Sequence, residues 1–225
     1  MGIGQRLLAS ARDLVGGLVL VVSLVASSTS IEAQLLPTTE ASRERPGVPA
    51  GPPLIPGVRL DLQEEYYEVR EETLNDVARQ LNGMRLQGPE APPSQGLTTY
   101  HIRPSWNALA RGGRCHVRNA EVFVDILITL PRWPGVFDRP VREREAWASI
   151  DRAIREHEYQ HRDLIVEAAG ALLEQIRDMD AQGCTVLRRS VSSAVSVAGE
   201  RLDRANEALD AGAPRRLSIG VGDRR

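Results

Sequence analysis

The order of apolar and polar positions predicts several strands followed by two long helices. Strand character is found at residues 63–70, 97–106 and 115–130. In the last of these, apolar residues alternate with other residues, so one face is strongly apolar. That face comprises Val122, Val124, Ile126 and Ile128. Between the first two strands, Thr73 is expected to cap a short helix that ends at Gly83.

The C-terminal half has the 3.6-residue period of amphipathic helices. Residues 141–181 contain no proline, Gly183 ends this segment, and a second helix is predicted over 185–209. Strands first and helices afterwards indicate an α+β fold. We expect a small antiparallel sheet with a short helix, packed on two long antiparallel C-terminal helices.

The N-terminal residues predict export. Arg6 and Arg12 precede an apolar run over 14–26, and small residues follow, so residues 1–33 are expected to be a signal peptide. The run is shorter than the roughly 20 residues that cross a bilayer. Retention of this segment as an anchor is the alternative. Otherwise the mature chain is secreted or periplasmic, with no integral membrane domain.

Composition divides the rest of the chain. Residues 34–57 contain six prolines and few large apolar groups, which is typical of an extended linker. The folded domain is expected over 58–211 and a flexible tail over 212–225. A formal net charge of -2 gives no reason to expect nucleic acid as a partner.

The chain contains two cysteines, Cys115 and Cys184. An even cysteine count in an exported chain predicts a disulfide between them. Two separate buried thiols are the alternative.

His157-Glu158-Tyr159-Gln160-His161 carries the chemistry. Two histidines four residues apart on a helix can bind one Zn²⁺, and the glutamate beside the first can act as general base. This motif is typical of zincin metallopeptidases. Both rings fall on the apolar stripe of the predicted helix, where an unpartnered polar group would be costly. A structural helix pair without metal is the alternative.

A third ligand is expected from the second helix. Asp203 and Asp210 flank its apolar stripe, whereas Glu200 and Glu207 point nearly opposite. Asp203 is favoured, and surface pairing with a neighbouring arginine is the alternative role of either aspartate. His101 and His116 are further ligand or oxyanion candidates, and three tyrosines are candidate proton donors. These are Tyr66, Tyr67 and Tyr100.

From Tyr66 to Leu209 the chain resembles the DUF922 family, described as predicted secreted zinc-dependent proteases. The shared features are Tyr67-Glu68-Val69, Gly88-Pro89, Cys115, Leu130-Pro131-Arg132-Trp133, Trp147, the histidine motif and Cys184. The family's last helix carries a segment like Tyr-Asp-x-x-Thr-x-His-Gly. Asp203 matches it, but Leu202, Asn206, Ala208 and Leu209 depart, so the family's histidine is missing at Ala208.

The sequence therefore predicts a secreted zinc peptidase that cleaves a peptide or protein substrate. His157, His161 and Asp203 are the expected zinc ligands, and Glu158 is the expected base. The strand around 122–128 is expected to bind extended substrate by edge pairing. The departure at Ala208 motivates the alternative, a non-catalytic exported zinc-binding or cell-envelope interaction module.

Overall fold

The computed structural model describes residues 55–88 and 93–213. The predicted signal peptide at 1–33, most of the predicted linker and residues 214–225 of the predicted tail lie outside the described residues. The first strand starts at Val58, where the folded domain was expected to begin.

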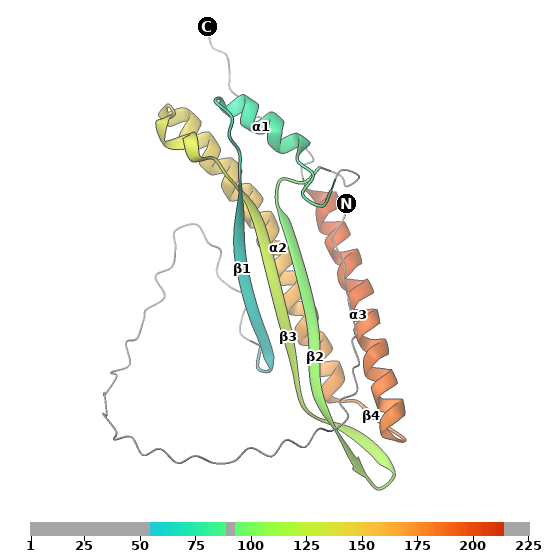
Figure 1. The fold of residues 1–225 in the computed structure, drawn as a ribbon. Coiled ribbons are helices and arrows are strands. Elements are labelled where there is room, and N and C mark those ends of the chain that lie inside the picture. Colours follow the sequence, from blue (N-terminus) through green and yellow to red (C-terminus); the bar gives the residue numbers. More distant parts are fainter. Residues whose placement is uncertain (1–54, 89–92, 214–225) are drawn as a thin grey trace, which may run out of the picture. The chain divides into compact units, whose positions relative to one another are not determined.

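A mixed sheet forms one layer of the fold, with β3 (Arg114–Arg132) at its centre (Figure 1). β2 (Leu97–Arg111) pairs antiparallel with β3, and β1 (Val58–Glu68) pairs parallel with it. The short β4 (Asp180–Ala181) pairs with the beginning of β3.

The α+β class is as predicted, but the sheet is not wholly antiparallel. β2 runs back from the end where β1 finishes, and β3 turns back again from β2 (Figure 1). Because β3 lies between the other two strands, it pairs parallel with β1.

This strand order corrects the expectation that the strand around 122–128 binds substrate through its edge. Val122 pairs with Val58 on one side and with Pro104 on the other, and the residues up to Ile128 are likewise paired on both sides. A strand bonded to two neighbours has no free edge for a third. Within the described residues, β1 and β2 are the outer strands of this three-strand path.

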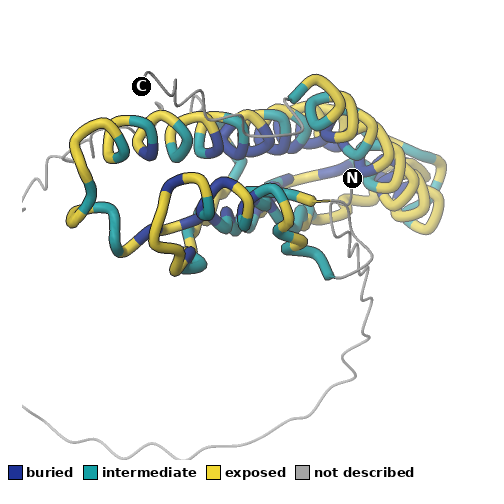
Figure 2. Tube along the Cα trace, turned by 90° about the horizontal axis from the view of Figure 1, so that it is seen from above, coloured by how far each residue is buried: buried dark blue, intermediate teal, exposed yellow. Residues whose placement is uncertain are grey.

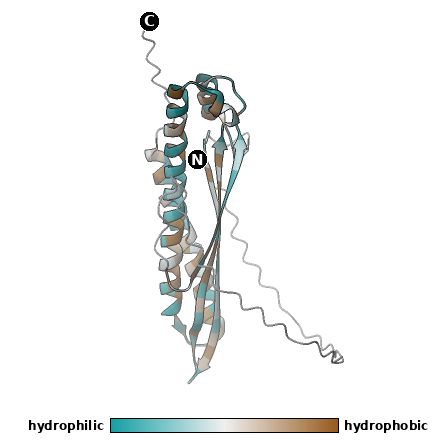
Figure 3. Ribbon diagram, turned by 90° about the vertical axis from the view of Figure 1, so that its left-hand side faces the viewer, coloured by the Kyte–Doolittle hydropathy of each residue, from teal (hydrophilic) through white to brown (hydrophobic). Residues whose placement is uncertain are grey.

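Two long helices form the second layer and cover one face of the sheet (Figure 3). A short 3-10 helix, η1 (Pro134–Asp138), leads into α2 (Val141–Arg177), and α3 (Cys184–Gly212) packs beside α2. Buried residues concentrate where the two layers meet (Figure 2). Among the described residues, no helix is both long and apolar enough to cross a membrane.

The apolar face predicted from alternation fills this core. Val122, Val124, Ile126 and Ile128 are all buried, at 2% exposure or less. The helices contribute residues such as Ile165, Leu173 and Leu187. Removal of so much apolar surface from water is the main force that holds helices and sheet together.

The short helix α1 (Leu74–Gly83) follows β1 and begins as predicted. Thr73 is its N-cap, and the hydroxyl oxygen of Thr73 accepts a hydrogen bond from the backbone N–H of Asp76. Such a bond satisfies one of the donors that the first helical turn leaves open.

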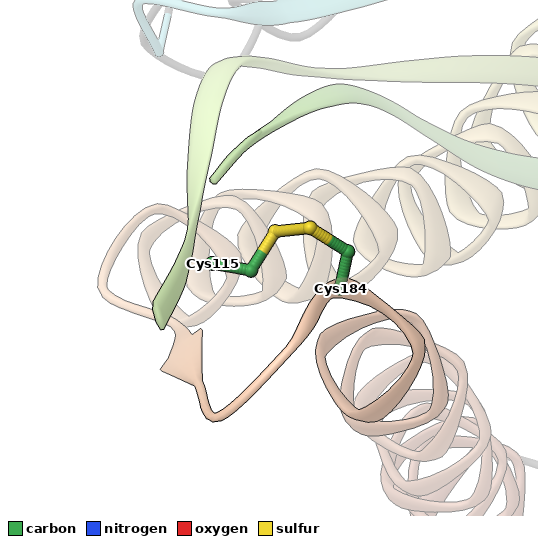
Figure 4. Close-up of a disulfide and its surroundings, with 2 residues drawn as sticks. All are labelled: Cys115 and Cys184. Atoms are coloured by element: carbon green, nitrogen blue, oxygen red, sulfur yellow. A yellow bond between two sulfur atoms is a disulfide. The ribbon is translucent and has the colours of Figure 1, made fainter. Parts of the chain in front are cut away.

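The predicted disulfide is present and joins the two layers (Figure 4). Cys115 lies at the beginning of β3, and Cys184 is the first residue of α3. The crosslink therefore fixes the start of α3 against the end of the sheet where β4 also pairs.

A polar cluster ties β1 to the flank of α2. The Glu64 carboxylate accepts hydrogen bonds from Arg155 at 2.9 Å and from the hydroxyls of Tyr159 and Tyr66. Burial raises the pKa of Glu64, but these hydrogen bonds and the charge of Arg155 outweigh it, so the pKa is lowered. The cluster holds a charged carboxylate between strand and helix.

Candidate metal centre

The two motif histidines lie in the middle of α2, one turn apart on the side that faces α3. Their rings are T-shaped to each other, and the Nε2 atoms of His157 and His161 are 3.2 Å apart. The His161 side chain is 6% exposed and that of His157 is 25% exposed. One ring is thus held in the protein, and the other borders solvent.

The carboxylate that meets these rings comes from the last turns of α3. Asp210 Oδ1 lies 2.9 Å from His161 Nε2 and 3.2 Å from His157 Nε2. These three residues form the group of potential metal ligands found among the described residues. The Asp210 side chain is 29% exposed, so solvent reaches the site from this side.

The three atoms converge at spacings that suit a small cation. Two ligand atoms bound to zinc at about 2.0–2.1 Å in a tetrahedral arrangement lie about 3.3 Å apart. The observed separations of 2.9–3.2 Å are close to that value. Lone pairs on two neutral imidazoles and a carboxylate would repel one another at these distances. The cluster therefore requires a proton or a metal ion between its members.

Electrostatics of the side chains agree with a site that attracts positive charge. Burial raises the pKa of Asp210, but hydrogen bonds with His157 and His161 outweigh it, so its pKa is strongly lowered. Burial lowers the pKa of His161, whereas hydrogen bonds with Asp210 and Asn206 raise it, and the net shift is upward. The carboxylate stays ionised, which is the form that binds metal.

The other ring nitrogen of His161 also has a partner on α3. Nδ1 lies 2.8 Å from Oδ1 of Asn206, which is 0% exposed. Asn206 and Asp210 are four residues apart, so side chains from one face of α3 contact both ring nitrogens of His161. A partner of this kind orients a ligand histidine.

Glu158, next to His157 on α2, faces the sheet at Thr98 on β2. It is 4% exposed, and its carboxylate oxygen Oε2 accepts a hydrogen bond of 2.8 Å from the Thr98 hydroxyl. Burial raises the pKa of Glu158, and the nearby Asp210 raises it further. The Thr98 hydrogen bond and the charges of His161 and His157 oppose this, and the net shift is upward.

Gly96 makes room for this carboxylate at the beginning of β2. A Cβ atom at position 96 would lie 2.6 Å from Glu158 Oε1, so any side chain there would force the buried Glu158 side chain to move. The adjacent Gln95 carbonyl accepts a hydrogen bond of 2.6 Å from the Tyr67 hydroxyl. The backbone at Gln95 and Gly96, which the Tyr67 hydroxyl holds in place, therefore encloses the Glu158 carboxylate.

The comparisons with known proteins bear on the domain that carries this site. Residues 64–213, about two-thirds of the chain, match the family described as bacterial protein of unknown function, DUF922. The chain belongs to this family. No curated protein matches the chain, and no solved structure matches it.

In this DUF922 domain the third member of the triad is Asp210. Asp203, which was expected in this role, does not lie at the histidines. Asp203 instead accepts a hydrogen bond of 3.1 Å from the Tyr100 hydroxyl and ties α3 to β2. Ala208, where the family's histidine was expected, is exposed. That departure leaves the triad intact.

The remaining candidates lie outside the triad of this DUF922 chain. His101 is part of β2, opposite Asp125 on β3. His116 is 3.9 Å from Asp180, close to the disulfide. Tyr66 belongs to the Glu64 cluster. Tyr67 and Tyr100 lie nearer to the site, and burial raises the pKa of both, so both phenols stay protonated.

Proposed function

We propose that this DUF922 protein is an exported zinc peptidase of the zincin type. The observation that carries the proposal is the convergence of His157 Nε2, His161 Nε2 and Asp210 Oδ1 within 3.2 Å of one another, with Glu158 next to His157 on α2. Two imidazoles and one carboxylate are a ligand set that catalytic zinc sites use. Three protein ligands leave a fourth position for water or substrate.

His157, His161 and Asp210 would hold the ion. A zinc ion held there would supply a bound water with a pKa of about 7 and a positive charge to polarise a carbonyl. Glu158 would accept the proton of the attacking water and return it to the leaving amine. Burial raises the pKa of the Glu158 carboxyl, which makes it a stronger base than an exposed carboxylate.

Thr98 and Gly96 support the base. The Thr98 hydroxyl fixes one carboxylate oxygen, and the absent side chain at Gly96 leaves space for the other. Precise placement of a base contributes strongly to rate, because small displacements are costly. Tyr67, tied to the neighbouring carbonyl of Gln95, supports this backbone in turn.

The start of β2 suits the approach of an extended peptide. Thr98 contacts Glu158, and within the described residues β2 is bonded to β3 along one side. The backbone groups of the opposite side are available to pair with a substrate strand. The disulfide is compatible with an oxidising compartment outside the cytoplasm, which supports the proposed export.

Zinc content of matched aspartate variants tests the ligand set. We expect purified wild-type protein to contain one equivalent of zinc by elemental analysis. Asp210→Ala should lose it, as should His157→Ala, whereas Asp203→Ala should retain it. Retention by Asp210→Ala with loss in Asp203→Ala would contradict the assigned triad, and a zinc-free wild-type protein would contradict the zinc proposal.

Hydrolysis by the zinc-loaded protein tests the activity. Glu158→Gln should keep stoichiometric zinc and lose cleavage of a peptide library by a factor of at least about 10², the lower range for a positioned acid–base group. Full activity in this variant would refute the assigned mechanism. Stoichiometric zinc without cleavage by the wild-type protein would favour the second candidate, a non-catalytic zinc-binding module. In such a module, the buried Glu158 and its hydrogen bond with Thr98 would have a structural role.

A further inference from the structure

His161 differs from His157 because both of its ring nitrogens have partners on α3. Nε2 faces Asp210 Oδ1 at 2.9 Å, and Nδ1 faces Asn206 Oδ1 at 2.8 Å. A neutral imidazole carries one proton, so only one of its nitrogens can offer a lone pair. Which nitrogen does so depends on the hydrogen bond that the other one makes.

We infer that Asn206 is a positioning residue that holds the His161 proton on Nδ1, so that the Nε2 lone pair points at the metal. The amide oxygen accepts the Nδ1–H bond. The inference rests on the proposed metal binding and assigns a role to a residue at which the chain departs from the segment expected for its family.

The surroundings of Asn206 support a role directed at the ring. The residue is 0% exposed, and its Nδ2 has no hydrogen-bond partner among the described residues. A buried amide donor without a partner destabilises the fold. Leu202, one turn earlier on α3, is buried and apolar, so this face of the helix accommodates aliphatic side chains. The bond to His161 is the interaction that accounts for an asparagine here.

The neutrality of the amide also matters. Two neutral histidines and one aspartate give the ligand set a charge of about -1, which leaves a divalent ion with net positive charge. Many ligand histidines are instead held by a carboxylate, which makes the ring more basic. Asn206 orients His161 without a second negative charge beside Asp210. The arrangement keeps the ion a stronger electrophile than an aspartate at position 206 would.

Zinc affinity of three variants tests the role. We expect Asn206→Leu to weaken zinc binding by about 10- to 100-fold, the usual effect of removing such a partner. Asn206→Asp restores an acceptor, so it should bind zinc at least as tightly as wild type. Leu202→Ala is the matched control: it disturbs the same helix face, and zinc affinity should stay within about threefold. Zinc dissociation constants are measured by competition with a chromogenic chelator, and far-UV circular dichroism checks folding.

A spectroscopic measurement covers the case in which Asn206→Leu does not fold. In ¹⁵N-labelled, zinc-loaded wild-type protein, His161 should show a protonated Nδ1 and a metal-bound Nε2. A His161 bound through Nδ1 would overturn the inference. So would Asn206→Leu with an unchanged dissociation constant, or an Asn206→Asp variant weakened more than tenfold, because either result means that the amide does not act as acceptor. Wild-type protein that binds no zinc overturns the proposed function instead.

Discussion

The two ends of the α2–α3 pair are fastened by different chemistry. At the start of α3, a covalent bond joins Cys184 to Cys115 on the central strand. Near the end of α3, the contact with α2 depends on polar side chains, with Asn206 and Asp210 addressing the two nitrogens of His161. The disulfide contact is permanent under oxidising conditions, whereas the polar contact depends on the proton or metal ion that binds between the side chains.

The two ends of this helix pair therefore have different roles: one sets the position of α3, and the other supplies the candidate metal ligands. The disulfide sets where α3 begins, which fixes its position along α2 over many turns. The far end can then bring a carboxylate from α3 to histidines of α2 with ångström accuracy. Asp210 lies 26 residues after Cys184 in the sequence, so a small error at the start would move the ligand out of reach.

Removal of the disulfide should have the largest effect on stability. The crosslink spans a sequence separation of 69 residues, and the loop-entropy relation gives about 4 kcal/mol for a loop of this size. Cys115→Ala/Cys184→Ala should lower the free energy of unfolding of chelator-treated protein by that order in urea titrations. A loss below about 1 kcal/mol would mean that the crosslink does not constrain the two layers.

Removal of zinc should act on the opposite end and by a smaller amount. Free zinc at 100 times its dissociation constant adds about 2.7 kcal/mol, which makes the open state about 100-fold less populated. A chelator should therefore speed amide hydrogen exchange over residues 203–212 far more than over 184–191. Equal acceleration at both ends would contradict the separation of the two roles.

Neither removal of the disulfide nor removal of zinc should alter the contribution of the Glu64 cluster to stability. Glu64→Gln removes a carboxylate held by Arg155, Tyr159 and Tyr66, and should cost about 2 kcal/mol at pH 7. Because the folded-state pKa of Glu64 is lowered, its stabilisation is present above the ordinary value of 4.5 and is lost as the pH falls through the folded pKa.

Urea titrations of chelator-treated wild type and Glu64→Gln at several pH values check this prediction. The difference in unfolding free energy should be greatest near pH 7 and shrink below about pH 4. Asp61→Asn, an exposed change on the same strand, serves as the matched control. A difference that grows in acid would mean that the cluster does not favour the ionised carboxylate.

Much of the fold was accessible from the sequence because it depends on local signals. The Thr73 cap, the alternation along β3 and the absence of proline over α2 each predict an element close to the observed one. The disulfide was predicted from the even cysteine count together with the expected export of the chain. The parallel pairing of β1 did not follow, because strand order depends on which strand lies between two others.

The third member of the triad shows where helical periodicity reaches its limit. Asp203 and Asp210 are seven residues apart, so they lie within about 20° of each other around the helix axis but about 10 Å apart along it. A helical wheel assigns both to the same face. The choice depends on how far α3 slides along α2, which tertiary packing and the disulfide determine.

The position of Asn206 on the predicted helix could have marked it as a residue of interest from periodicity alone. It is a polar residue one turn from Leu202 on the apolar stripe, and a buried polar residue requires a partner. Its partner, His161, was itself predicted to lie on the apolar stripe of α2. Glu158 was predicted as the base from the motif alone, but its contacts with Thr98 and Gly96 could not be predicted, because they depend on how β2 packs against α2.

The four-residue spacing on α3 has a consequence for finding related sites. His157-Glu158-x-x-His161 on one helix is matched by Asn206-x-x-x-Asp210 on the next, so two short patterns and the distance between them encode the whole cluster. Other chains that carry both patterns on successive helices should assemble the same geometry where their packing sets the same position of one helix along the other. The pair of patterns, rather than the first alone, is the signature by which such proteins can be recognised.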